Sequence, residues 1–145
     1  MSVARAGRRV DATADRAFSL WVDVARWEAF VDGFRAVEHL DEAWPAVGSS
    51  VVWRSVPDGR GRVTERVVVC DPPKRFETEV TEERLRGAQT VAFEAEDAST
   101  AVSLTLDYSV DGGPLTWLTD VLFIRRAQGE ALARTLDRFA AEAAA

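Results

Sequence analysis

Residues 101–139, AVSLTLDYSVDGGPLTWLTDVLFIRRAQGEALARTLDRF, contain the patterns of a strand, a turn and a long helix in succession. Apolar and polar residues alternate from Val102 to Val110, which predicts a strand with one buried face. The segment Asp111–Pro114 ends this strand, and its proline suits the first turn of a helix. From Pro114 to about Glu142 the apolar spacing is helical, so we expect one long C-terminal helix.

The expected inner stripe of this helix contains two residues that are unusual in a core helix, Arg125 and Gly129. The whole stripe is Leu115, Leu118, Leu122, Arg125, Gly129, Leu132, Leu136 and Phe139. A glycine in a helix interior costs about 1 kcal/mol relative to alanine, so it needs a compensating reason. One interpretation is that the missing bulk leaves room for a ligand, which Arg125 orients. The alternative is that Arg125 extends to solvent and Gly129 relieves a close strand crossing.

Upstream of this stretch, turn residues separate further short elements. A strand is expected at Val3–Val10, then a helix that Thr13 caps, then a second short helix at Arg26–Val31. The remaining strands are expected at Arg35–Asp41, Ser50–Val56, Arg62–Asp71, Arg75–Glu83, Gln89–Glu96 and Ala101–Val110. This order predicts a single α+β domain over residues 1–145, with an antiparallel seven-stranded curved sheet wrapped around the long helix.

A curved sheet approaches a straight helix closely at the ends of the contact and less closely in its middle, so a cavity can form there. The valine run in Arg62–Asp71 leaves two phases open: one turns Glu65 toward the helix, and the other turns Arg66. Trp53 and Arg54 likewise lie on opposite faces of their strand. Either phase places an ionisable group among apolar neighbours, where a structural partner is the alternative to a ligand.

Aromatic residues supply the other candidates. Trp27, Phe30 and Phe34 gather near the connection from helix to strand, where they would form one mouth of the groove or seal the end of the sheet. The full set of candidate ligand-binding residues is Trp27, Phe30, Phe34, Trp53, Arg54, Glu65, Arg66, Phe93, Tyr108, Leu118, Leu122 and Arg125.

Composition excludes several classes of function. The chain has 24 acidic and 18 basic residues, and its net charge of -6 argues against nucleic acid as a partner. A single cysteine and a single histidine exclude an internal disulfide and leave almost nothing from which to build a metal site, so we expect neither metal nor cofactor. No apolar run suggests a signal peptide or membrane insertion, which makes the cytoplasm the expected compartment.

The chain resembles the SRPBCC (START-like, helix-grip) superfamily, and within it the polyketide cyclase/dehydrase-like branch. The segments that show the resemblance are DATADRAFSLWVDVARWEAFVDGF, VGSSVVW, GRVTERVVVCDPPKRFETEV and the C-terminal stretch that begins STAVSLTLDYS. The resemblance implies a β-α-α-β6-α helix-grip fold with a cavity between the sheet and the terminal helix. The family pattern usually has proline near position 12, where this chain has Ala12.

Three functions follow from the residues and the resemblance together. The first is binding of a small hydrophobic or polycyclic molecule, with Arg125, Tyr108 or Glu65 orienting a polar end. The second is cyclase or aromatase chemistry on a poly-β-ketone, in which Arg54 or Arg66 supplies positive charge and Tyr108 or Glu65 moves a proton. The third is a protein-interaction module with a vestigial pocket. The sequence identifies neither the ligand nor a catalytic residue, and it does not define the oligomeric state.

Overall fold

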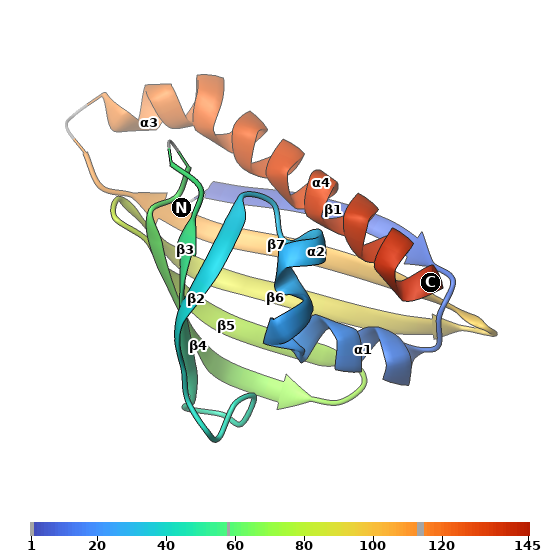
Figure 1. The fold of residues 1–145 in the computed structure, drawn as a ribbon. Coiled ribbons are helices and arrows are strands. Elements are labelled where there is room, and N and C mark those ends of the chain that lie inside the picture. Colours follow the sequence, from blue (N-terminus) through green and yellow to red (C-terminus); the bar gives the residue numbers. More distant parts are fainter. Residues whose placement is uncertain (1, 58, 113–114) are drawn as a thin grey trace.

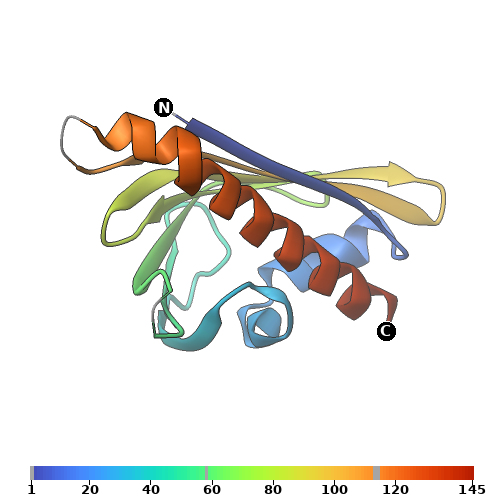
Figure 2. The same cartoon turned by 90° about the horizontal axis from the view of Figure 1, so that it is seen from above.

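An antiparallel sheet of seven strands curves around the C-terminal helix (Figures 1 and 2). The computed structural model describes residues 2–57, 59–112 and 115–145. The strand order is β1-β7-β6-β5-β4-β3-β2, so the first strand lies beside the last and the two edges are β1 and β2. The strands are β1 (Ser2–Val10), β2 (Phe34–Leu40), β3 (Ser50–Ser55), β4 (Arg62–Asp71), β5 (Arg75–Thr81), β6 (Leu85–Glu96) and β7 (Ser99–Val110). The predicted α+β class with a wrapped, curved sheet is confirmed.

All the helices lie on the concave face of the sheet (Figure 1). They are α1 (Ala14–Val22), η1 (Val24–Arg26), α2 (Trp27–Phe30), α3 (Thr116–Thr119), η2 (Asp120–Ile124) and α4 (Arg125–Ala144). Thr13 caps α1 as predicted, because its Oγ1 accepts a hydrogen bond of 3.3 Å from the backbone N–H of Arg16. The predicted helix start at Pro114 lies outside the described residues. Among those described, none of the helices combines the length and apolar character needed to cross a bilayer.

The strand β6 begins at Leu85, ahead of its predicted start at Gln89. The sequence pattern treats Gly87 as a turn residue, whereas the structure places it inside the strand, opposite Tyr108 of β7. A Cβ atom at Gly87 would lie 2.4 Å from the backbone oxygen of Asp107. The glycine is therefore required by the close approach of two strands rather than by a turn.

A bulge in β4 resolves the phase that the valine run left open. Val67 pairs with Thr78, but the next paired residue is Val69, so Val68 is the extra residue. Before the bulge, Glu65 and Val67 are buried on the concave face; after it, Cys70 faces inward, opposite Phe76. Each of the two predicted phases therefore applies to one half of the strand.

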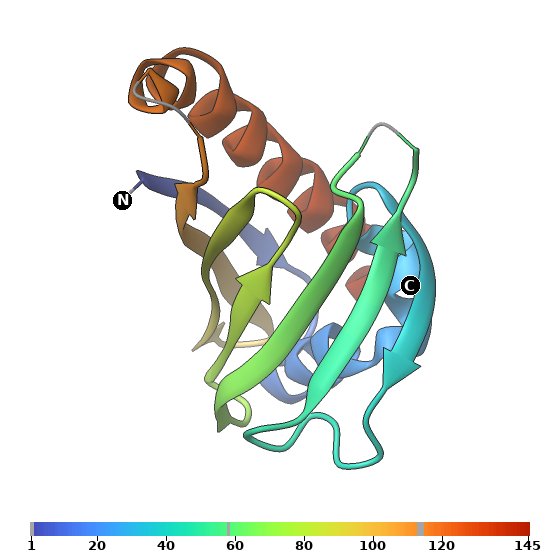
Figure 3. The same ribbon diagram turned by 90° about the vertical axis from the view of Figure 1, so that its left-hand side faces the viewer.

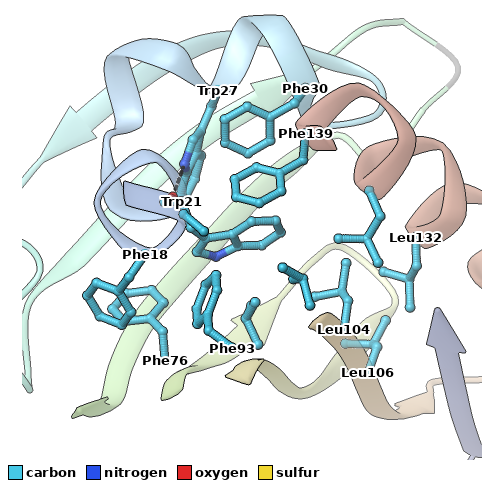
Figure 4. Close-up of a cluster of buried hydrophobic side chains, with 14 of the residues drawn as sticks. Phe18, Trp21, Trp27, Phe30, Phe76, Phe93, Leu104, Leu106, Leu132 and Phe139 are labelled. Atoms are coloured by element: carbon cyan, nitrogen blue, oxygen red, sulfur yellow. Dashed lines mark hydrogen bonds between the residues drawn. The ribbon is translucent and has the colours of Figure 1, made fainter. Parts of the chain in front are cut away.

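Aromatic side chains fill the space under the C-terminal half of α4 (Figure 4). The rings of Trp21 and Phe30 both pack on Phe139, with centroids 5.3 Å and 5.1 Å away. Farther along, Phe18 packs edge-on against Phe76 and Phe93. Burial of such large rings is the main stabilising contribution to a core. It also closes this end of the space between helix and sheet.

Candidate functional site

An inner cavity of about 230 Å³ remains between the sheet and the N-terminal half of α4. On the helix side, two small residues, Ala127 and Ala131, line the cavity. Phe139, in the second half of the same helix, faces the aromatic core instead. Leu104 and Leu106 form its floor on β7, and the indole rings of Trp21 and Trp27 close the end next to the aromatic core. Ala127 and Ala131 present less bulk to this space than Phe139 presents to the core, which helps to leave it unfilled.

An outer cleft of about 710 Å³ adjoins the inner cavity and is open to solvent. The β3–β4 loop, the β5–β6 loop and the beginning of the terminal helical segment surround it. Figure 3 views the molecule from this end, with the β3–β4 loop and α3 facing each other. Gly59, Arg60 and Gln128 line both spaces. The two spaces therefore adjoin at these three residues, which gives the inner cavity a way out to solvent.

Glu65 is the buried acidic group in the wall of the inner cavity. Its Oε2 accepts a 2.8 Å hydrogen bond from Trp53 Nε1, and its Oε1 accepts one of 3.1 Å from Thr78 Oγ1. Burial raises the pKa of this carboxyl above its ordinary value, although the charge of Arg60 and the two hydrogen bonds act in the opposite direction. A perturbed carboxyl in a cavity is typical of a functional site.

Arg60 separates the inner cavity from the outer cleft. Its guanidinium forms an ion pair with Glu82 at 2.5 Å, and it lies over the indole ring of Trp53, 5.0 Å from the ring centroid. The carboxylate of Glu82 is almost fully buried, with 8% of its side chain exposed. Arg60 is therefore held in place by a charge on one side and an aromatic face on the other.

Of the predicted residues, the structure brings Trp27 and Glu65 to the cavity wall. Trp53 lies directly behind Glu65 as its hydrogen-bond donor, and Phe34 packs on Trp53 with a centroid distance of 5.4 Å. Phe30 does not line the cavity: it belongs to the aromatic core around Phe139. These placements follow from the inward phase of β3 and the first half of β4.

Phe93 and Tyr108 are buried away from the cavity. Phe93 packs under α1 against Phe18. The Tyr108 hydroxyl donates a 2.6 Å hydrogen bond to Asp120 Oδ1, and Ser2 Oγ donates to the other oxygen of that carboxylate. Burial and the bond to Asp120 raise the pKa of Tyr108 well above its usual value. This phenol therefore fixes the start of the terminal helix to the sheet, and the predicted orienting role for Tyr108 is wrong.

Arg54 and Arg66 lie on the outer face of the sheet, so their predicted place in the pocket is also wrong. Arg54 pairs with Glu38 at 2.7 Å, and Arg66 pairs with Glu79 at 3.3 Å. Each arginine directly follows an inward residue, Trp53 or Glu65, and successive side chains of a strand point to opposite faces. The bulge comes too late in β4 to turn Arg66 inward.

The prediction of an inward-facing stripe on the terminal helix is wrong for the first half of that helix. Arg125 is exposed and lies 3.9 Å from Asp120 rather than in the cavity, and Leu118 is also exposed. The side chain of Leu122 lies outside the described part of the structure. The turn η2 is a π-helix, which accommodates one extra residue and rotates what precedes it by roughly 100° relative to a regular helix. Leu132, Leu136 and Phe139, which follow it, are buried as predicted.

Neither interpretation of Gly129 matches the structure. A Cβ added there would meet no atom within 4 Å outside its own helix, so no strand crosses closely. Gly129 also does not line either of the two spaces described above.

Sequence reasoning missed several residues of the wall, namely Arg60, Gln89, Gln128, Ala131 and Thr135. Gln128, Ala131 and Thr135 do recur at helical spacing, one residue out of phase with the predicted stripe. Arg60 lies in a hairpin loop, and nothing local to the loop indicates that it turns back over the sheet. No cluster of three or more His, Cys, Asp or Glu side chains suited to a metal ion occurs in the described residues.

A family model described as polyketide cyclase / dehydrase and lipid transport matches residues 1–144. The chain belongs to this family. The predicted resemblance to the SRPBCC superfamily is thereby confirmed, and the match extends over almost the whole chain. No curated protein gives a significant match to the sequence.

Solved structures share the fold of this chain. A protein from Thermus thermophilus has a TM-score of 0.77 at 21% identity, with 98% of this chain and 97% of that one covered. A protein from Chromobacterium violaceum has a TM-score of 0.76 at 14% identity, covering 100% and 99% of the two chains. Norcoclaurine synthase from Thalictrum flavum has a TM-score of 0.68 at 12% identity, covering 97% and 85%. At these identities the likeness extends to the fold alone.

Proposed function

We propose that this protein binds a small, largely apolar molecule in the inner cavity, which the molecule reaches through the outer cleft. The observation that supports the proposal most directly is the cavity itself, of about 230 Å³, next to an open cleft of about 710 Å³. Together they fall in the range of about 300–1,000 Å³ that is usual for small-molecule sites. The lipid-transport part of the family description is in keeping with an apolar ligand.

The mixture of walls supports binding of an apolar body with a polar end. Leu104, Leu106 and the two indole rings offer apolar surface, whereas Glu65 and Gln89 offer polar atoms from the sheet. Such a wall orients a ligand through a few polar contacts and stabilises it through burial of the remainder. A cytoplasmic location and a single domain remain parts of this proposal.

Catalysis on a poly-β-ketone is the second candidate, and one observation favours it: Glu65 is a buried carboxyl positioned to exchange a proton with a cavity ligand. The positive charges expected from Arg54 and Arg66 are on the outer face, so Arg60 is the cation that would have to stabilise an enolate. Arg60 is already paired with Glu82. We therefore favour binding over catalysis.

The proposal is tested by filling the cavity. Ala131 lines it, whereas Ala133 is exposed on another side of the same helix. We expect Ala131→Phe to abolish the thermal stabilisation that fatty acids, quinones or polycyclic aromatics give the wild type, and Ala133→Phe to preserve it. A ligand at 100 times its Kd should stabilise the wild type by about 2.7 kcal/mol.

Two outcomes would contradict the proposal. One is that no member of the panel stabilises the wild type in a saturable way. The other is that Ala131→Phe binds as well as Ala133→Phe does, which would place the ligand elsewhere. Turnover of a poly-β-ketone mimic that Glu65→Gln abolishes would instead favour the second candidate.

A further inference from the structure

Glu65 forms no direct ion pair, which distinguishes it from Glu82 and Asp32, two other acidic residues near the inner cavity. Its two hydrogen-bond partners, the indole of Trp53 and the hydroxyl of Thr78, are both neutral. No ion pair joins it to any residue in the described part of the chain. The residue is 5% exposed, so water offers little compensation for a charge there.

Two other acidic residues near the inner cavity, Glu82 and Asp32, have arginine partners. Glu82 holds Arg60 at 2.5 Å, and Asp32 holds Arg134 and Arg138 at 3.0 Å and 3.1 Å. Arg60 attracts Glu65 from a distance, but its hydrogen bonds go to Glu82. Of these three carboxylates, Glu65 is the one that contacts no arginine, and it lines the inner cavity.

Both hydrogen-bond partners of Glu65 donate to its carboxylate oxygens, so the carboxyl acts as an acceptor. An indole N–H can only donate, so one carboxylate oxygen has a fixed donor at 2.8 Å. Donors on both oxygens favour the charged form of a carboxyl, while burial favours the neutral form. A cation that enters with a ligand would resolve this conflict, because it supplies charge where the protein supplies only dipoles.

We propose that the ligand of the inner cavity carries a basic amine, whose ammonium group pairs with Glu65 while its apolar body packs against Leu104, Leu106 and the Trp27 ring. This inference rests on the proposed function and adds the chemical class of the ligand. An anionic ligand would face the Glu65 carboxyl, whose direct partners are both neutral, at the same depth. A neutral ligand would gain hydrogen bonds but no charge pairing.

Amine and proton compete for the same carboxyl. Since burial raises the pKa of Glu65, its protonation at low pH should weaken amine binding. The charged groups that face this part of the cavity are Arg60 and Glu82 from the loops at the mouth and Asp32 from the α2–β2 connection. All three are held in ion pairs with one another or with α4.

The test uses three probes with one ring system: 2-(2-naphthyl)ethylamine, 2-(2-naphthyl)ethanol and 2-naphthylacetic acid. Isothermal titration at pH 7 should show that the amine binds the wild type tightest and the acid weakest. Glu65→Gln should weaken the amine by roughly tenfold to hundredfold, the range for a hydrogen bond to a charged group. It should leave the alcohol nearly unchanged. Glu79→Gln, the same change on the outer face of the next strand, should alter neither.

The outcomes separate this inference from the proposed function. Equal binding of amine and alcohol to the wild type would overturn the amine and leave a cavity that binds apolar molecules. Equal loss of both in Glu65→Gln would do the same. Failure of all three probes to bind would overturn the amine, and the fatty acid, quinone and polycyclic panel then decides whether the cavity binds anything. Because the wild-type comparison needs no variant, a folding defect in Glu65→Gln would not obscure the result.

Discussion

Leucine at position 65 should destabilise the protein more than glutamine does. Both substitutions remove the charge and keep a side chain of similar size. Glutamine can accept the hydrogen bond from Trp53 Nε1 and donate one to Thr78 Oγ1, because a hydroxyl both donates and accepts. Leucine accepts neither bond, and it leaves the indole N–H facing an apolar side chain at a site that is 5% exposed.

The magnitude follows from the number of groups that lose their partner. A buried donor without an acceptor costs about 1–3 kcal/mol. The difference rests at least on the Trp53 indole, whose N–H can only donate. In a domain of this size 1 kcal/mol shifts the Tm by roughly 2–4 °C. We therefore expect the Tm of Glu65→Leu to lie about 2–12 °C below that of Glu65→Gln.

Scanning calorimetry or circular dichroism at pH 7 measures this difference directly. The control pair is Glu79→Leu and Glu79→Gln, because Glu79 is exposed on the outer face. Its two variants should differ by less than about 0.5 kcal/mol. Equal Tm values for the two Glu65 variants would refute the argument that these hydrogen bonds hold the carboxyl in the cavity wall.

The pH dependence of the wild type against Glu65→Gln tests the direction of the pKa shift. Burial raises the pKa of Glu65 above its ordinary 4.5, so its favourable contribution is fully present below pH 4.5 and is lost as the pH rises through the folded-state pKa. The Tm of Glu65→Gln minus the Tm of the wild type should therefore increase as the pH rises above 4.5. A difference that shrinks with rising pH would show that the shift has the opposite sign.

Three further substitutions test other features. Gly87→Ala should lower the Tm, because its Cβ would lie 2.4 Å from the backbone oxygen of Asp107; Gly7→Ala, whose Cβ would have 3.8 Å to its nearest atom, is the control and should be nearly neutral. Gly129→Ala should stabilise by about 1 kcal/mol in urea unfolding, since open space surrounds it and alanine is the better helix former; destabilisation would reveal an unseen contact. Asp32→Asn should lower the Tm at neutral pH and lose this effect as the pH falls below 3.8, because its two arginine partners outweigh burial and lower the pKa of Asp32; a pH-independent effect would contradict this.

The fold could be predicted because its determinants are local. The alternation from Val102 to Val110 and the helical spacing from Leu132 to Phe139 each depend on one segment, and the structure shows both. Order along the chain then limits the topology, since consecutive antiparallel strands need only short connections. The strand β6 was predicted too short because Gly87 is a turn residue in local terms and a close-approach residue in the sheet.

The candidate site could be predicted only in part, because small irregularities determine which way its residues face. A bulge at Val68 divides β4 into two phases, and the π-turn Asp120–Ile124 divides the terminal helix into two. Each irregularity is one extra residue in an otherwise regular pattern, and no particular residue type marks its position. Periodicity alone therefore does not locate the irregularity. Arg60 depends on the path of a hairpin loop that brings it over Trp53, which is a tertiary contact.

The polar group of the cavity was predicted on the helix, as Arg125, but the structure places it on the sheet, as Glu65. This difference changes which ligands the cavity can recognise. With Arg125 in the cavity, the helix would have offered a cation, and a carboxylate or carbonyl would have been the natural partner. The structure instead sends Arg125 toward Asp120 and leaves uncharged residues on the cavity side of α4, namely Ala127, Gln128, Ala131, Leu132 and Thr135. The polar end is then Glu65, fixed by donors on β3 and β5, strands that belong to one continuous sheet. Such a carboxyl is positioned by the sheet itself, so its preference for a positively charged ligand should persist even if the helix above it moves to admit one.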